Sequence, residues 1–140
     1  WKHRPTGGTT DYAVEMYFDA INNGKYECFV NEDTRLPMMF MDDAIRATLE
    51  LMDAPLDSLN YHSNYNLSSM SFSAKELANE ISLHIDFECT YKPDYRQDIA
   101  NTWPISIADE DARNDWGWEP KFDISKMTEE MITNLRRLNG

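Results

Sequence analysis

Apolar residues recur along the chain with two different periods, and these periods predict alternating helices and strands. Apolar positions three or four residues apart predict helices that begin near residues 10, 73 and 123. The apolar residues on these stripes are Ala13, Met16, Tyr17, Ala20, Ile21, Leu77, Ala78, Ile81, Ile85, Ile124, Met127, Met131, Leu135 and Leu138. A further helical segment, 44–52, is apolar on nearly every side, and shorter extended segments at 26–30, 35–41, 65–67 and 87–91 predict strands.

Residues that start and stop helices support these boundaries. Thr10 is the expected N-cap of the first helix, and Gly24 ends that helix after two asparagines. Ser73 and Glu76 have the spacing of a capping box, and Gly117 follows a short acidic helix. Helices and strands therefore alternate with short connections, which predicts an α/β layer structure. No repeat or linker divides it, so we expect residues 1–140 to be a single domain.

Charge and composition narrow the classes of partner. The 140 residues carry a formal net charge of −12, so we expect neither nucleic acid nor an anionic membrane as partner. No apolar run reaches the roughly 18 residues of a spanning helix, and no signal peptide is visible. Cys28 and Cys89 lack CxxC spacing, which is typical of a reduced intracellular protein. The start at Trp1-Lys2-His3-Arg4, without a methionine, indicates a piece of a longer chain.

Common catalytic and metal-binding motifs are missing from the sequence. The candidate metal ligands are His3, His62, His84, Asp42, Asp43, Asp109, Glu110 and Asp111. The histidines have no ligand spacing, and the acidic residues stand where helices begin, where the helix dipole stabilises them without an ion. We therefore expect no metal. No G-x-S-x-G elbow occurs, so a hydrolase nucleophile has no support.

Two short segments are candidates for binding a ligand. In "GGTTDYA" two glycines and two threonines precede a helix, whose unpaired N–H groups attract a carboxylate or phosphate. The alternative is an ordinary glycine turn followed by a threonine cap. In "NTWP" Trp103 either forms the wall of a pocket or fills the core.

Several segments together resemble one family. They are "GGTTDYAVEMYFDAINNGKYECFV", "TRLPMMFMDDAIRATLELMDAP", "YNLSSMSFSAKELANEI", "YKPDYRQDIANTWP" and "ARNDWGWEPKFD". In this order they are similar to the carboxyl-terminal part of NAD-dependent L-threonine 3-dehydrogenases of the extended short-chain dehydrogenase (epimerase-like) family. The resemblance implies the substrate-binding half of a Rossmann-type fold, with the dinucleotide-binding half absent.

The resemblance also implies an activity and a site. The family oxidises L-threonine to 2-amino-3-ketobutyrate with NAD, and it lines the amino-acid pocket with residues that match Gly8, Thr9 and Trp103. Thr10 is expected to cap the helix instead. The implied partners are L-threonine and an amino-terminal half, which holds most of the NAD site and forms a homodimer. The implied location is intracellular, in the cytoplasm or the mitochondrial matrix.

The chain departs from the family in its catalytic parts. No glycine-rich dinucleotide turn occurs in it, and no tyrosine has a lysine four residues later to lower its pKa. We therefore expect no catalytic residue in this chain and no turnover by the chain alone. Two alternatives stay open, namely the substrate domain of a nucleotide-sugar epimerase or dehydratase, and a non-catalytic interaction domain of the same fold. The first would need basic residues for a diphosphate, such as Arg35, Arg46, Arg96 and Arg113.

Overall fold

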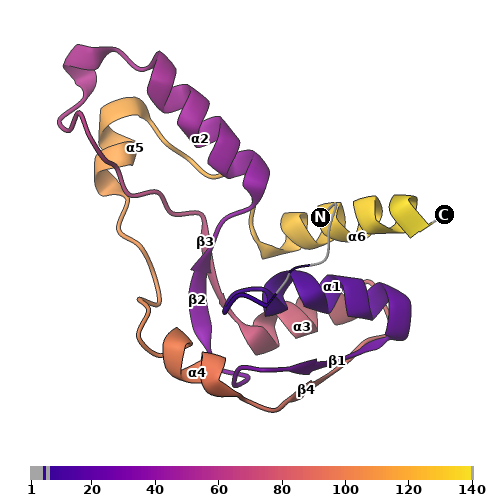
Figure 1. The fold of residues 1–140 in the computed structure, drawn as a ribbon. Coiled ribbons are helices and arrows are strands. Elements are labelled where there is room, and N and C mark those ends of the chain that lie inside the picture. Colours follow the sequence, from indigo (N-terminus) through magenta and orange to yellow (C-terminus); the bar gives the residue numbers. More distant parts are fainter. Residues whose placement is uncertain (1–4, 6, 140) are drawn as a thin grey trace.

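Helices and strands alternate along most of the chain (Figure 1). The structure, a computed structural model, describes residue 5 and residues 7–139, so the segment Trp1-Lys2-His3-Arg4 lies outside the described residues. In chain order the elements are α1 (Tyr12–Asn23), β1 (Lys25–Cys28), β2 (Arg35–Met38), α2 (Met41–Asp53), the 3₁₀ turn η1 (Leu56–Ser58), β3 (Met70–Ser73), α3 (Ala74–Ser82), β4 (Glu88–Tyr91), α4 (Tyr95–Ala100), α5 (Glu110–Trp116) and α6 (Ile124–Asn139). The predicted α/β architecture is confirmed.

Two separate pairs of strands connect distant parts of the sequence. β1 and β4 are parallel, with Lys25 opposite Glu88, and β2 and β3 are antiparallel, with Arg35 opposite Ser73. A parallel pair needs a long crossover, which here contains β2, α2, β3 and α3. The parallel pair is short, with four residues in each strand, and parallel strands of α/β proteins are normally covered by helices.

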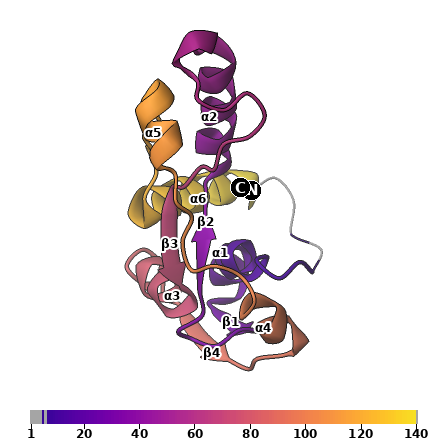
Figure 2. The same cartoon turned by 90° about the vertical axis from the view of Figure 1, so that its left-hand side faces the viewer.

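The main core lies between α1, α3, α6 and the β1–β4 pair, which lie together in both views (Figures 1 and 2). α1 presents its predicted stripe to this core, with Met16 fully buried and Tyr17 only 1% exposed. Tyr17 reaches α6, where its hydroxyl lies 2.7 Å from the hydroxyl of the fully buried Thr128. The periodicity of apolar residues therefore identified most of the inner faces of these helices, but Leu138 of the predicted stripe is 54% exposed, and Ile85 lies beyond the end of α3.

α2 and α5 form a second, smaller cluster that extends away from the main core (Figure 1). Ala47 of α2 and Ala112 of α5 pack with Trp118, whose side chain is 1% exposed. Asp43 joins α2 to the segment ahead of α6, because its carboxylate accepts hydrogen bonds from the backbone N–H groups of Lys121 and Phe122 at 3.0–3.1 Å. The buried Asp43 carboxylate therefore connects the α2–α5 cluster to the segment that leads into α6.

Local signals placed several helix ends correctly. Gly24 has φ of 67° and donates its N–H to the carbonyl of Ala20, so it ends α1 as a left-handed residue. Ser73 and Glu76 form the predicted capping box at the start of α3. Gly117 likewise follows α5 with a φ of 75°.

Two predictions of secondary structure are wrong. The strand expected at 65–67 does not form, because Tyr65 and Leu67 pack against the α2–α5 cluster, and the strand lies at Met70–Ser73 instead. The helix α4, which begins after Asp94, was not predicted. The Asp94 side chain accepts from the N–H of Arg96 and so caps it.

Candidate functional site

The two glycines of "GGTTDYA" form a tight turn that is closed by a side chain of the chain itself. The N–H groups of Gly7 and Gly8 donate to one carboxylate oxygen of Asp11 at 2.9 and 2.6 Å. Gly7 has φ of 114°, which favours glycine, and a Cβ on Gly8 would lie 3.1 Å from the Asp11 carboxylate. The anion that occupies these N–H groups is therefore Asp11.

This arrangement changes the role expected for the turn. The sequence suggested that the glycine N–H groups receive a ligand's carboxylate, but both are already hydrogen-bonded to Asp11. Asp11 also stands at the N-cap position of α1, although its side chain does not cap the helix. Thr10 contributes only its carbonyl, which accepts from Ala13, so the threonine cap predicted from the sequence is wrong.

The Thr9 hydroxyl is one group that this turn leaves available, as is that of Thr10. Thr9 is partly exposed, and its side chain makes no hydrogen bond with another described residue. It lies one position past Gly8, on a backbone that Asp11 fixes from the other side. A hydroxyl held on a rigid turn is suited to donating a hydrogen bond to a small polar ligand.

Trp103 does not fill the core. Trp103 follows α4, and its backbone N–H donates to the carbonyl of Ala100 at 3.1 Å. Its side chain is 44% exposed. Tyr95 and Ile99 of α4 are exposed beside it in the sequence at helical spacing. The structure therefore contradicts the core-filling interpretation and leaves the indole at the surface of the described residues.

The segments that carry Thr9 and Trp103 are anchored at the same end of the β1–β4 pair. Phe29 follows β1, and its ring contacts Tyr12 at the start of α1 with the ring centroids 5.8 Å apart. The guanidinium of Arg96, from α4, also lies over the Phe29 ring, 3.2 Å from the ring centroid. Since β1 runs back along α1 after the turn at Gly24 (Figure 1), the start of α1 and α4 both lie at the carboxyl end of these strands.

Hydrogen bonds strengthen the attachment of α4. The side-chain oxygen of Gln97 accepts from the N–H of Asn31 at 2.6 Å and from the hydroxyl of Thr34 at 3.0 Å. The N–H of Asp94 donates to the carbonyl of Phe29 at 3.1 Å. In open α/β sheets ligands bind at the carboxyl ends of the strands, so this end is the candidate site.

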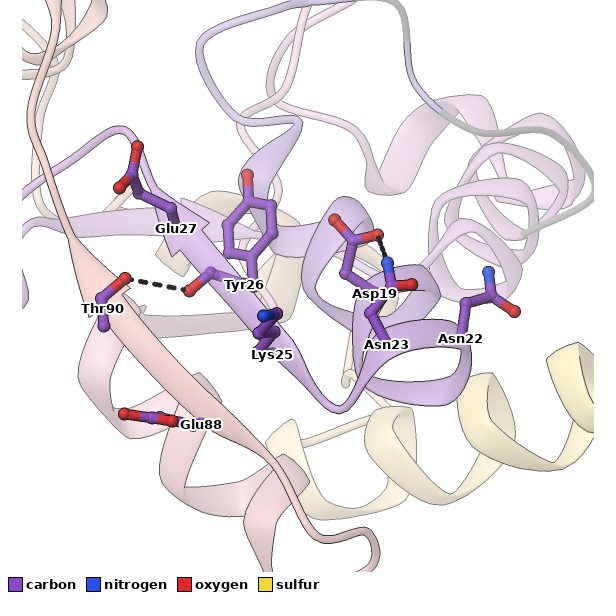
Figure 3. Close-up of a pocket in the computed structure, with 8 residues that line it drawn as sticks. All are labelled: Asp19, Asn22, Asn23, Lys25, Tyr26, Glu27, Glu88 and Thr90. Atoms are coloured by element: carbon purple, nitrogen blue, oxygen red, sulfur yellow. Dashed lines mark hydrogen bonds between the residues drawn. The ribbon is translucent and has the colours of Figure 1, made fainter.

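The largest described cavity lies at the other end of these strands (Figure 3). It has a volume of about 700 Å³ and lies between the end of α1 and the start of β1. Its lining residues are Asp19, Asn22, Asn23, Lys25, Tyr26, Glu27, Glu88 and Thr90. None of five cavities in the described part of the chain is lined by Gly8, Thr9 or Trp103.

The tyrosines around the site are not poised to act as a base. Burial raises the pKa of Tyr12 above its ordinary value, and the nearby Cys28 adds to this effect. Burial also raises the pKa of Tyr26, and the hydrogen bond that its hydroxyl donates to Glu15 raises it further. The Tyr12 hydroxyl is buried without a hydrogen-bond partner among the described residues. These phenols therefore stay protonated near neutral pH.

Sequence reasoning missed Asp11 and Phe29. The signal for Asp11 was its position three residues after Gly8, because a short carboxylate often bonds backbone N–H groups a few residues away. Phe29 gave no such signal, since its contacts come from distant parts of the sequence.

Metal-ligating residues are not gathered at this site. Among the described residues no group of three or more His, Cys, Asp and Glu side chains could hold a metal ion. Asp109, one of the candidate ligands, is bound to Arg113 at 2.9 Å. In the part of the chain that the structure describes, no helix has the length and apolar character needed to cross a bilayer.

Comparison with known proteins gives close relatives. No family model matches the chain. A monomeric L-threonine 3-dehydrogenase from a metagenome is 86% identical with a TM-score of 0.95, over 100% of this chain and 46% of that one. The mitochondrial L-threonine 3-dehydrogenase of Bos taurus is 48% identical over 139 residues, 98% of this chain and 36% of the bovine protein. An uncharacterized epimerase/dehydratase of Staphylococcus haemolyticus is 46% identical over 91% of this chain and 41% of its own length.

The fold and these similarities define the class of protein. The α/β architecture resembles part of the Rossmann-type fold of the epimerase-like short-chain dehydrogenases. Within this class the sequence matches the carboxyl-terminal part of L-threonine 3-dehydrogenases. It spans less than half the length of each of these relatives.

Proposed function

We propose that residues 1–140 form the substrate-binding domain of an L-threonine 3-dehydrogenase. Joined to its amino-terminal half, the protein oxidises L-threonine to 2-amino-3-ketobutyrate with NAD. The observation that carries this proposal is the 86% identity to an L-threonine 3-dehydrogenase across 100% of the chain. The position of the start of α1 and of α4 at the carboxyl end of β1 and β4 supports it, because ligands of open α/β sheets bind at that end.

Thr9 and Trp103 are the proposed contacts to the amino acid. The Thr9 hydroxyl donates a hydrogen bond to the carboxylate of L-threonine, and the exposed Trp103 indole covers its methyl side. Gly8 acts indirectly, since its lack of a Cβ lets Asp11 close the turn. In support, the Thr9 hydroxyl has no partner among the described residues, and Trp103 is 44% exposed.

These residues do not form a dinucleotide site. The chain has no glycine-rich turn between a strand and a helix, and Asp11 occupies the N–H groups of Gly7 and Gly8. NAD, which accepts the hydride in this reaction, is therefore proposed to bind mainly to the amino-terminal half. The base that removes the hydroxyl proton is assigned to the same half.

The parent protein is proposed to be intracellular, in the cytoplasm or the mitochondrial matrix. The bovine relative is mitochondrial by name. The resemblance implied a homodimer through the amino-terminal half, whereas the metagenomic relative is described as monomeric. Given the 86% identity we propose a monomeric parent, and light scattering of the full-length protein measures its mass directly.

Substitutions in the full-length protein test the proposed site. We expect Thr9→Val and Trp103→Ala each to raise KM for L-threonine about tenfold, the effect of losing one hydrogen bond or one apolar wall. Thr10→Val is the matched control, because Thr10 is adjacent and also partly exposed. KM for NAD should be unchanged in all three proteins. Unchanged KM for L-threonine in both Thr9→Val and Trp103→Ala would refute the site.

A nucleotide-sugar substrate is less compatible with the structure. A diphosphate needs basic side chains, but all four candidate arginines already pair with carboxylates. The pairs are Arg35–Glu76, Arg46–Asp43, Arg96–Asp94 and Arg113–Asp109. Steady-state assays of the full-length protein with L-threonine and with nucleotide sugars separate the two functions.

A further inference from the structure

Gln97 is a buried polar residue in a helix that is too short to be stable by itself. α4 has only six residues, so contacts with other parts of the chain must hold it in place. Gln97 is 8% exposed, and both ends of its side-chain amide are used. The oxygen accepts from the N–H of Asn31 and the hydroxyl of Thr34. The NH2 group donates to the side-chain oxygen of Asn101 at 2.7 Å.

Asn101 stands where the chain leaves α4 and turns towards Trp103. It is the C-cap of α4, and its N–H donates to the carbonyl of Gln97 at 2.9 Å. The turn continues through Thr102, whose N–H and hydroxyl both donate to the carbonyl of Ile99, at 3.0 and 2.7 Å. Gln97 is therefore bonded both to the loop after β1 and to the turn that ends at Trp103.

The indole of Trp103 has little packing of its own. It is 44% exposed and belongs to neither of the two described hydrophobic clusters. Its position therefore follows the backbone of α4 and of the turn. The contact of Arg96 with the Phe29 ring attaches the beginning of α4, whereas Gln97 is bonded to the end that leads to Trp103.

We propose that Gln97 is a positioning residue for the amino-acid substrate. It holds the Trp103 indole where the indole covers L-threonine, and it does not touch the substrate itself. This role rests on the function proposed above, because Gln97 acts through the contact assigned to Trp103. Loss of the amide leaves the N–H of Asn31 and the hydroxyl of Thr34 without their acceptor in a partly buried place, so α4 loosens and the indole loses its fixed position.

Steady-state kinetics of the full-length protein test this role. Gln97→Met keeps the length of the side chain and removes its three hydrogen bonds. We expect KM for L-threonine to rise about fivefold and KM for NAD to stay unchanged. In the double variant Gln97→Met/Trp103→Ala, KM should equal that of Trp103→Ala alone, because no indole is left to position. Asp98→Met is the matched control at an exposed position of α4 and should leave both KM values unchanged.

Amide hydrogen exchange reads the position of this segment without any substrate. In Gln97→Met the N–H groups of Asn31 and Trp103 should exchange roughly tenfold faster than in the wild type, whereas those of α6 should be unchanged. Thr34→Val removes only one of the three hydrogen bonds. It should shift KM for L-threonine and the exchange rates about twofold in the same directions, and it decides the question if Gln97→Met does not fold.

Three results would overturn the proposal. Additive effects in the double variant would mean that Gln97 supports the fold in general and does not act through Trp103. Unchanged exchange in Gln97→Met would mean that Gln97 does not hold the segment. Unchanged KM in Gln97→Met, with a raised KM in Trp103→Ala, would mean that the indole needs no such support. An unchanged KM in Trp103→Ala itself would refute the proposed site together with this role, so that single variant distinguishes a failure of the site from a failure of Gln97 alone.

Discussion

At the scale of single residues, Asp43 shows how a charged side chain becomes part of the core. Its side chain is 1% exposed, and Arg46 pairs with it at 2.9 Å. Burial alone would raise the pKa of Asp43, but Arg46 and the N–H groups of Lys121 and Phe122 outweigh burial and hold this pKa below its usual value. The sequence analysis explained Asp43 by the helix dipole and missed this longer-range role.

Removing the Asp43 carboxylate should strongly destabilise the protein. Asp43→Ala leaves two backbone N–H groups unpaired and removes one carboxylate partner of Arg46, which keeps its pair with Glu50, and we expect it to lower the free energy of unfolding by about 3–5 kcal/mol in urea denaturation. Asp42→Ala is the control, since Asp42 is exposed in the same helical turn, and it should cost at most about 1 kcal/mol. Similar decreases in the free energy of unfolding for both variants would contradict a stabilising role of the hydrogen bonds from Lys121 and Phe122 to Asp43.

The pH dependence of this loss gives a second readout. Because the folded pKa of Asp43 is lowered, its contribution is fully present above the unfolded pKa of about 3.9 and is lost as pH falls through the folded pKa. The difference in stability between wild type and Asp43→Ala should therefore be constant near neutral pH and narrow below about pH 4. A constant difference down to pH 2 would be inconsistent with a lowered pKa.

The candidate site was only partly predictable at this scale. "GGTTDYA" correctly indicated a glycine turn, and Gly7 adopts the positive φ that the sequence suggested. It did not indicate that Asp11 would occupy the N–H groups, because several acceptors could have competed for them. The exposure of Trp103 likewise depends on how α4 packs, and α4 itself was not predicted.

At the scale of elements, a buried hydrogen bond fixes how α6 packs on α1. Tyr17 and Thr128 are each at most 1% exposed, and their hydroxyls lie 2.7 Å apart. A buried hydroxyl that loses its partner costs more than the net value of the bond, since its desolvation is no longer compensated. This pair is therefore sensitive to changes on either helix.

A double-mutant cycle measures this contact. Tyr17→Phe and Thr128→Val should each lower the free energy of unfolding by about 1–3 kcal/mol. The double variant should lose clearly less than the sum, with a coupling of about 0.5–3 kcal/mol. Thr133→Val on the exposed side of α6 is the control and should change stability by at most about 0.5 kcal/mol. Additive losses would mean that the hydroxyls do not interact.

At the scale of the whole molecule, we propose that the chain is a substrate-side half, and its sequence lacks the glycine-rich turn of a dinucleotide site. We expect isolated residues 1–140 to neither bind NAD nor reduce it with L-threonine, because no glycine-rich turn and no Tyr-x-x-x-Lys pair occurs in the chain. Absorbance at the wavelength of NADH, with the full-length protein as positive control, checks this directly. Turnover by the isolated chain would contradict it, whereas recovery on adding the amino-terminal half would support it.

The sequence by itself determined the local features of this protein. It predicted the stripes of α1, α3 and α6, the glycine that ends α1 and the capping box of α3, because each depends on residues within a few positions of one another. It also carried the resemblance to L-threonine 3-dehydrogenases, and the comparisons confirm that resemblance. The apolar residues of the segment 44–52 were visible as well, but not which face of α2 would be covered.

Only the tertiary structure decided how distant segments meet. The start of α1 and α4 come to the same end of the strands through Phe29, and Asp43 reaches residues far along the chain. Met41, Ile45, Leu49 and Met52 of α2 are exposed because α2 packs on α5 with its opposite face. Such contacts depend on the paths of several elements at once, and no local pattern of residues specifies them.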